Sequence, residues 1–270
     1  MRKPSGFLCS LALAGTVVVS TSVALAATMT GTNGNDRIKG SHGPDAISAL
    51  AGNDVVRALK GNDMVSGAEG FDRLFGGKGD DVQDGGPGND LIGAGKGDDV
   101  SRGDVGFDRL FGGRGQDQLD AGPGNDLVVG GPGNDVTMGG EGNDVQFANR
   151  GVDTHFGGPG DDRLWAMARH DKLAADGTGD TLVGGPGNDT FRTREGQPDK
   201  IDCGEGIDVA FLDFKDIIVD ATPANPKGSC ERVVRKRRHS RKDRDDERKA
   251  EHDDDRFERE GDKGQGKKDR

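Results

Sequence analysis

The nonapeptide Gly85-Gly86-Pro87-Gly88-Asn89-Asp90-Leu91-Ile92-Gly93 displays the period that governs most of this chain. Stepping by nine residues from Gly31 gives 18 consecutive units, the last of which begins at Gly184. The sixth position is aspartate in every unit, and the fourth is glycine in all but two, where Arg169 and Thr178 stand instead. Such a short, regular period indicates a repeat architecture in which each unit packs only on its neighbours.

The residue types within a unit predict a glycine turn followed by a short strand. Glycines at positions one, two and four would break a helix, but they suit a turn with positive φ. Positions seven to nine are left to form a strand whose eighth residue, apolar in 13 of the 18 units, points inward. Two units then make one coil, and units two apart stack at about 4.8 Å. We therefore expect an all-β fold, a right-handed parallel β-roll (β-solenoid) of nonapeptide repeats.

This stacking brings the aspartates into columns, with Asp81 above Asp99 and Asp90 above Asp108. Carboxylates spaced by about 4.8 Å repel one another strongly unless a cation lies between them. Calcium accepts about six to eight oxygen ligands in flexible geometry, whereas magnesium demands a tighter octahedron and zinc or copper prefers His and Cys. Asparagine would serve better if the side chain only capped its turn. The unbroken aspartate column therefore favours Ca²⁺.

The best-formed units, 85–93, 130–138, 139–147 and 184–192, resemble the nonapeptide of haemolysin-type calcium-binding (RTX) proteins. The resemblance extends over about residues 31–211 and implies a parallel β-roll that holds calcium between its turns and folds on calcium binding after export. Turns that begin at 49, 58, 148, 166 and 175 lack the paired glycines and match the pattern less well. The aspartates expected to bind calcium are Asp72, Asp81, Asp90, Asp99, Asp108, Asp117, Asp126, Asp135, Asp144, Asp162, Asp180 and Asp189.

The first 26 residues have the pattern of a secretory signal peptide. Arg2 and Lys3 precede an apolar stretch over 11–19, and Ala24-Leu25-Ala26 offers a small-x-small cleavage site. The apolar stretch is too short for a membrane span, with Gly15 and Thr16 inside it and Ser20 directly after it. We therefore expect an extracellular, secreted protein that has no membrane span after cleavage.

Two cysteines, Cys203 and Cys230, remain after this cleavage, and an even pair in an oxidising compartment predicts a disulfide. They bracket a segment that follows a slip in the nine-residue phase after Arg192 and that contains an apolar patch. Solenoids need a cap over their last coil. The expected organisation is a signal peptide at 1–26, calcium-binding repeats at 27–202, a disulfide-tied cap at 203–232 and a disordered mixed-charge tail at 233–270.

Charge and composition narrow the possible functions. Residues 27–230 hold 35 acidic and 19 basic residues, a net charge of −16, which favours cations over nucleic acid as partners. The sequence contains no recognisable nucleophile or acid–base motif, so we expect no enzyme. The expected cofactor is Ca²⁺, in a structural or interaction role outside the cell, with a cell-surface or extracellular polymer as a candidate partner.

The alternative function is an extracellular ligand-binding or adhesion module that uses the outer face of the rod. A face of this kind is expected to carry flat rows of threonine or aromatic residues. No such row is evident in the linear sequence, which ranks this function second.

Overall fold

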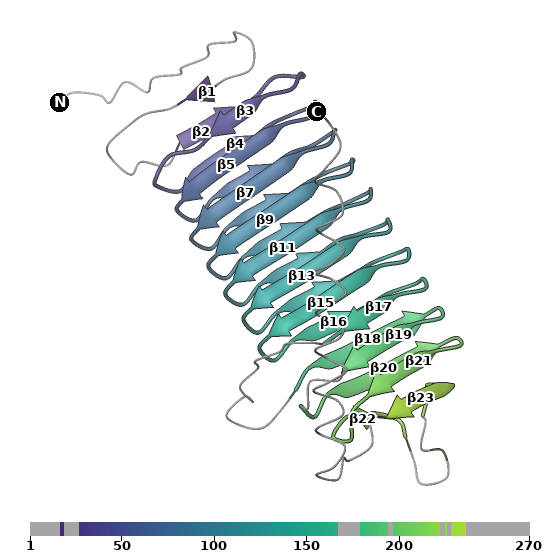
Figure 1. The fold of residues 1–270 in the computed structure, drawn as a ribbon. Helices are drawn as coiled ribbons and strands as arrows, with labels where there is room; N and C mark the ends of the chain where they lie inside the picture. Colours follow the sequence, from purple (N-terminus) through teal and green to yellow (C-terminus); the bar gives the residue numbers. More distant parts are fainter. Residues whose placement is uncertain are drawn as a thin grey trace, which may run out of the picture. The chain divides into compact units, whose positions relative to one another are not determined.

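The computed structural model describes residues 27–166, 179–193, 197–221, 225 and 228–235, together with the backbone of 17–18. Every regular element in these ranges is a β-strand, and the strands form two parallel sheets (Figure 1). The predicted all-β, parallel β-solenoid is therefore confirmed. Within the described ranges no helix is long and apolar enough to cross a membrane. Apart from 17–18, the predicted signal peptide lies outside the described residues, as does 236–270 of the predicted tail.

The chain alternates between the two sheets, so that odd-numbered strands form one and even-numbered strands form the other. Sheet A consists of β1 (Val17–Val18), β3 (Arg37–Lys39), β5 (Val55–Lys60), β7 (Arg73–Lys78), β9 (Leu91–Lys96), β11 (Arg109–Arg114), β13 (Leu127–Pro132), β15 (Val145–Arg150), β17 (Arg163–Trp165), β19 (Thr190–Thr193), β21 (Val209–Leu212) and β23 (Arg232–Arg235). Sheet B consists of β2 (Ala27–Thr30), β4 (Asp45–Ser48), β6 (Met64–Ser66), β8 (Val82–Asp84), β10 (Val100–Arg102), β12 (Gln118–Asp120), β14 (Val136–Met138), β16 (Thr154–Phe156), β18 (Thr181–Pro186), β20 (Lys200–Glu205) and β22 (Ile217–Ile218). One turn of the solenoid thus takes one strand from each sheet.

The core lies between the two sheets and receives the eighth residue of every described unit, whether that residue is apolar or polar. The apolar members form two clusters, one within 29–128 and one within 148–230. Around the junction of these two ranges the eighth residues Thr137, Gln146 and His155 are polar and buried, and their side chains contact one another at 2.5–3.2 Å. Burial lowers the pKa of His155 to about 4, so the imidazole is neutral at physiological pH.

The stack departs from the predicted unbroken period at one unit. The main-chain N–H of Asp153 donates to Asp180, and that of Asp162 donates to Asp189, each 27 residues further on instead of the predicted 18. The stack therefore contains one nine-residue unit fewer than the sequence predicts at this point. Ala166 still donates to the next coil at Arg192, and residues 167–178, which follow it, lie outside the described residues.

The fourth position of a turn is tightly packed. At Gly160, the fourth residue of its turn, an added Cβ would collide with the carbonyl oxygen of Gly142 in the coil before. Glycine is nevertheless not required there in every coil, because Asp180 and Asp199 belong to column B although Thr178 and Gln197 stand two residues before them.

The final coils also lose the 18-residue spacing. Asp180 pairs with Asp199, 19 residues away, and Asp199 pairs with Asp216, 17 residues away. The predicted disulfide between Cys203 and Cys230 is present, with the two Cα atoms 5.3 Å apart. Residues 233–235, which the sequence assigned to the tail, belong to β23 and pair with β21.

Candidate metal centres in the aspartate columns

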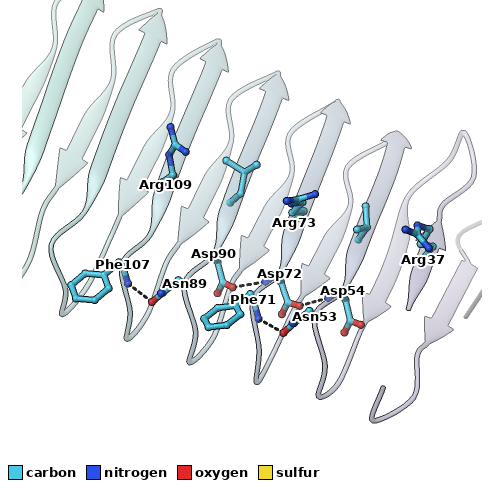
Figure 2. A pocket seen from close by; sticks show the side chains of 12 residues that line it. Arg37, Asn53, Asp54, Phe71, Asp72, Arg73, Asn89, Asp90, Phe107 and Arg109 are labelled. Carbon is cyan, nitrogen blue, oxygen red and sulfur yellow. Dashed lines mark hydrogen bonds between the residues drawn. The ribbon is translucent and has the colours of Figure 1, made fainter. Parts of the chain in front are cut away.

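Each of the two turn edges of the solenoid carries a column of buried aspartates, and Figure 2 shows part of one. Column A, at the turns that lead into sheet A, consists of Asp36, Asp54, Asp72, Asp90, Asp108, Asp126, Asp144, Asp162, Asp189 and Asp208. Column B, at the turns that lead into sheet B, consists of Asp45, Asp63, Asp81, Asp99, Asp117, Asp135, Asp153, Asp180, Asp199 and Asp216. Within a column, each main-chain N–H donates to Oδ1 of the next aspartate at 2.7–3.2 Å.

All twelve aspartates that the sequence proposed as ligands lie in these columns. The columns also include residues that the sequence discounted, among them Asp54 and Asp63, because their turns lack a glycine at position two. The structure shows how those turns form without it. Leu50 and Leu59 take positive φ values of 75° and 89° at that position, a conformation that favours glycine but is not closed to other residues. Aspartate at position six was therefore the more reliable signal.

The second carboxylate oxygen, Oδ2, distinguishes the interior of the columns. It is sealed from solvent, and it has no hydrogen-bond partner within the described part of the chain. A buried oxygen left in this state costs about 1–3 kcal/mol, and more when it is charged. This applies to Asp54, Asp63, Asp72, Asp81, Asp90, Asp99, Asp108, Asp117, Asp126, Asp135, Asp144, Asp162, Asp189 and Asp208.

Burial changes the acidity of these carboxyl groups. It raises the pKa of Asp90 to about 7 and that of Asp162 to about 8, against the lowering effect of the N–H that each accepts. Neighbouring carboxylates of the same column add to the rise. At neutral pH the columns therefore either retain protons or require a cation to compensate their charge.

Main-chain carbonyl oxygens lie next to the same Oδ2 atoms. A Cβ added to Gly103 would lie 2.5 Å from Oδ2 of Asp108 and 2.5 Å from the carbonyl oxygen of Ala121 in the next coil. Similarly, a Cβ added to Gly112 would lie 2.5 Å from Oδ2 of Asp117 and 2.6 Å from a carbonyl oxygen of the next coil. Oxygen atoms from two successive coils thus approach one small space beside each turn.

The donor set fits a hard cation. Across the described residues, no group of three or more His, Cys, Asp or Glu side chains is placed to hold a metal ion by itself. A metal in the columns must therefore take main-chain carbonyl oxygens as well as carboxylates. Calcium accepts this mixture in flexible geometry, whereas zinc and copper favour nitrogen or sulfur ligands.

The first aspartate of each column has different partners. Oδ2 of Asp36 accepts hydrogen bonds from the main-chain N–H of Thr32 at 2.5 Å and from its hydroxyl at 2.9 Å. Asp45 accepts the N–H of Ser41 at 2.6 Å and the Ser41 hydroxyl at 2.9 Å. These are the only two units with a hydroxyl residue at position two, a signal that could have identified the N-terminal end of the stack from sequence.

The last aspartate of column B is also supplied with donors. Oδ2 of Asp216 accepts the hydroxyl of Thr193 and the main-chain N–H of Asp213, both at 2.6 Å. At the end of column A, the N–H of Asp208 donates to Glu231 at 2.7 Å, but Oδ2 of Asp208 has no hydrogen-bond partner within the described residues. Protein groups therefore satisfy the carboxylates of Asp36, Asp45 and Asp216, whereas Asp208 resembles the interior of the columns.

The comparison with protein families agrees with this geometry. The chain matches the family described as RTX calcium-binding nonapeptide repeat (4 copies) at residues 30–65, 59–92, 66–101, 93–128, 102–137, 117–146 and 156–191. Together these matches cover 30–146 and 156–191, which is more than half of the chain. No curated protein matches the chain significantly. Repeats of this family bind Ca²⁺, as the buried aspartate columns lead one to expect. The chain belongs to the RTX calcium-binding nonapeptide repeat family.

Proposed function

We propose that this chain is an exported, non-enzymatic protein whose β-roll folds around Ca²⁺ and serves a structural or interaction role outside the cell. The observation that carries the proposal is the series of buried Oδ2 atoms that lack a hydrogen-bond partner within the described residues. So many desolvated carboxyl groups oppose folding unless cations or protons compensate them. Calcium binding and folding are then coupled, because the site exists only when two coils are stacked.

The proposed ligands are the twelve aspartates predicted from the sequence, together with Asp54, Asp63 and Asp208, whose buried Oδ2 atoms have no hydrogen-bond partner within the described residues. Carbonyl oxygens of the adjoining glycine turns complete the donor set. Bound Ca²⁺ supplies the positive charge that neutralises the carboxylates of two coils. The protein supplies the rest: glycine turns that let successive coils approach, and N–H donors that orient each carboxylate through Oδ1.

Equilibrium dialysis of the chain at neutral pH tests the ligand assignment. We expect several Ca²⁺ ions per chain, bound cooperatively with affinities of about 10⁻⁴–10⁻³ M, the range of many extracellular calcium modules. Cooperativity follows because each ion stabilises a coil that also forms the next site. Magnesium at the same concentration should not displace them. Binding of one ion or none, or equal binding of magnesium, would contradict the assignment.

The C-terminal segment 203–232 is proposed to cap the last coil. Cys203 and Cys230 are both buried in the second apolar cluster, and their disulfide ties the segment to the stack. A disulfide also supports an oxidising compartment, in line with the predicted signal peptide. Export is tested by sequencing the N-terminus of the protein recovered from the culture medium. We expect it to begin at residue 27, and a full-length chain retained in the cytoplasm would contradict export.

A further inference from the structure

The outer face of sheet A brings together side chains that are distant in sequence. It consists of two columns, the residues at positions seven and nine of each unit, which alternate with the buried residue at position eight. Strand register aligns the first column as Arg37, Val55, Arg73, Leu91, Arg109, Leu127, Val145, Arg163, Thr190, Val209 and Arg232. It aligns the second as Lys39, Arg57, Phe75, Gly93, Phe111, Val129, Phe147, Trp165, Arg192, Phe211 and Val234.

Charge is strongly segregated onto this face. Its two columns carry eight exposed cations and no acidic residue: Arg37, Lys39, Arg57, Arg73, Arg109, Arg163, Arg192 and Arg232. The equivalent two columns of sheet B carry two cations, Arg102 and Lys200, and three acids, Asp84, Asp120 and Asp202. The repeat region as a whole is acidic, so a face without a single acid is not the result of a basic composition. It is complementary to an anionic partner.

Aromatic side chains accompany these cations. Phe75 and Phe111 stand two coils apart, and the strand spacing separates them by roughly 9.6 Å. Phe147 and Trp165 follow, with ring centroids 4.6 Å apart and edge-on geometry. The guanidinium of Arg192 lies 5.6 Å from the Trp165 centroid. This row was not evident in the linear sequence because its members lie 18 or 36 residues apart, so the expectation that the rod lacks an aromatic row was wrong.

Figure 2 shows where this face meets column A. Arg37, Arg73 and Arg109 border a surface groove of about 540 Å³, and Phe71 and Phe107 stand on the turns at its rim. These two phenylalanines are 57% and 59% exposed, so much of each ring faces solvent in the described part of the chain. The arginines recur every second coil, so they too are spaced by roughly 9.6 Å.

We propose that the outer face of sheet A binds an anionic polysaccharide along the axis of the coil stack. Arginine binds carboxylate or sulfate through two parallel hydrogen bonds, and aromatic rings stack on the apolar faces of sugars. The interval between successive arginines is close to the length of a disaccharide in an extended chain. A polymer with one anionic group per disaccharide would therefore meet one arginine at each repeat. This inference rests on the calcium-loaded, extracellular roll proposed above.

The observations favour this partner over other anionic polymers. Successive phosphates of one strand of duplex DNA rise by about 3.4 Å along the helix axis, a shorter repeat than that of the arginines. A lipid surface would require protruding apolar side chains across the face, whereas its own aromatic residues, such as Phe75 and Phe111, are only partly exposed and the exposed Phe71 and Phe107 lie on the turns at its rim. Asp54, Asp72 and Asp90 also line the groove. Their charge would repel an anion unless Ca²⁺ compensates it, so we expect the polysaccharide to bind only the calcium-loaded protein.

The test is calorimetric titration of the full chain, in excess Ca²⁺, with a hyaluronan oligosaccharide, which bears one carboxylate per disaccharide. Neutral dextran, a single-stranded oligonucleotide and phosphatidylglycerol vesicles are the comparison ligands. The variant Arg73→Gln with Arg109→Gln removes two cations from sheet A. Its matched control, Arg102→Gln with Lys200→Gln, removes two cations from sheet B. Far-UV circular dichroism in Ca²⁺ shows whether each protein has folded.

We expect the sheet A variant to bind hyaluronan about tenfold more weakly, and the sheet B control to remain within about twofold of the unmodified chain. Dextran should show no binding, and the oligonucleotide and vesicles should bind more weakly than hyaluronan. Equal losses in the two variants, or tighter binding of the oligonucleotide or the vesicles, would overturn the inference. A chain that shows no β signal in Ca²⁺ would instead overturn the proposed function, and this inference with it.

Discussion

The ends and the interior of the aspartate columns differ in what satisfies their carboxylates. At the N-terminal end, Thr32 and Ser41 donate main-chain and hydroxyl hydrogens to Asp36 and Asp45. In the interior, residues such as Asp90 keep one buried oxygen without a hydrogen-bond partner among the described residues. The difference teaches that protein groups satisfy the carboxylates at both N-terminal ends and at Asp216, whereas the interior carboxylates, and Asp208 at the end of column A, keep an oxygen for a cation.

The same comparison explains the residue at position two. A hydroxyl residue there would donate to the aspartate and compete with a cation, whereas glycine donates only its main-chain N–H and permits the positive φ of the turn. Glycine occupies this position through most of 76–144, and Thr or Ser occupies it only in the first two units. The predictions below change the interior, then the C-terminal end, then the N-terminal end of the columns.

The largest effect is expected from the interior. Asp90→Ala with Asp108→Ala should remove one calcium site and weaken its neighbours, because each ion stabilises the coil that forms the next site. We expect the midpoint of a calcium titration, followed by circular dichroism, to rise by about tenfold. The control, Asp84→Ala with Asp120→Ala, removes two carboxylates from the outer face of sheet B and should leave the midpoint unchanged. An unchanged titration in the first variant would count against the columns as calcium sites.

Opening the disulfide should destabilise the C-terminal end. Cys203→Ala with Cys230→Ala releases a constraint that spans 27 residues, which corresponds to about 3.5 kcal/mol of unfolding free energy. Urea denaturation in saturating Ca²⁺ measures the loss. Because column contacts remain intact, the number of calcium ions bound should not change. Identical denaturation midpoints for the two proteins would show that the cap does not depend on this bond.

Removing the N-terminal donors should have a smaller effect. Thr32→Val with Ser41→Ala leaves Asp36 and Asp45 without their hydroxyl donors but keeps the main-chain N–H groups. We expect a loss of about 1–2 kcal/mol in urea denaturation, with calcium stoichiometry unchanged. Thr32→Ser retains the hydroxyl and serves as the control. If the double variant gained a calcium ion and no stability were lost, the end aspartates would be metal sites like those of the interior.

A pH dependence of calcium binding follows from the raised pKa values of the interior. Burial raises the pKa of Asp90 to about 7, above the value of about 3.9 for an unfolded chain. The metal-free roll therefore binds more protons than the unfolded chain between about pH 4 and pH 7, and its stability falls as pH rises through this window. Calcium competes with these protons, so its midpoint should be several-fold higher at pH 6 than at pH 8. Titrations with equal midpoints at the two pH values would be inconsistent with buried carboxyl ligands.

Much of the fold was predictable because it depends on a local pattern repeated many times. The aspartate at position six and the inward residue at position eight, such as Asp90 and Ile92, take the predicted places in every described coil. The omission of one unit was not predicted, because aspartate at position six continues through it as Asp171. The most regular position of the repeat therefore did not show where the stack departs from the period.

The two candidate binding surfaces also differ in how far the sequence predicted them. The candidate calcium ligands could be identified one unit at a time, since each unit contributes one aspartate at a fixed position. The arginine and aromatic face could not, because it emerges only when register places residues such as Arg73 and Arg109 two coils apart. The hydrogen bonds that complete Asp36 and Asp216 likewise depend on the geometry of the stack ends.

The most direct test of the central claim is a far-UV circular dichroism titration of residues 27–270 with calcium and, separately, with magnesium, starting in chelator at pH 7.5. If the interior aspartates require a calcium ion, the chain should be largely unordered in chelator and acquire its β signal cooperatively at millimolar or lower calcium, but not with magnesium. A β signal already complete in chelator would show that the aspartates stabilise the turns without a metal, and would contradict the account.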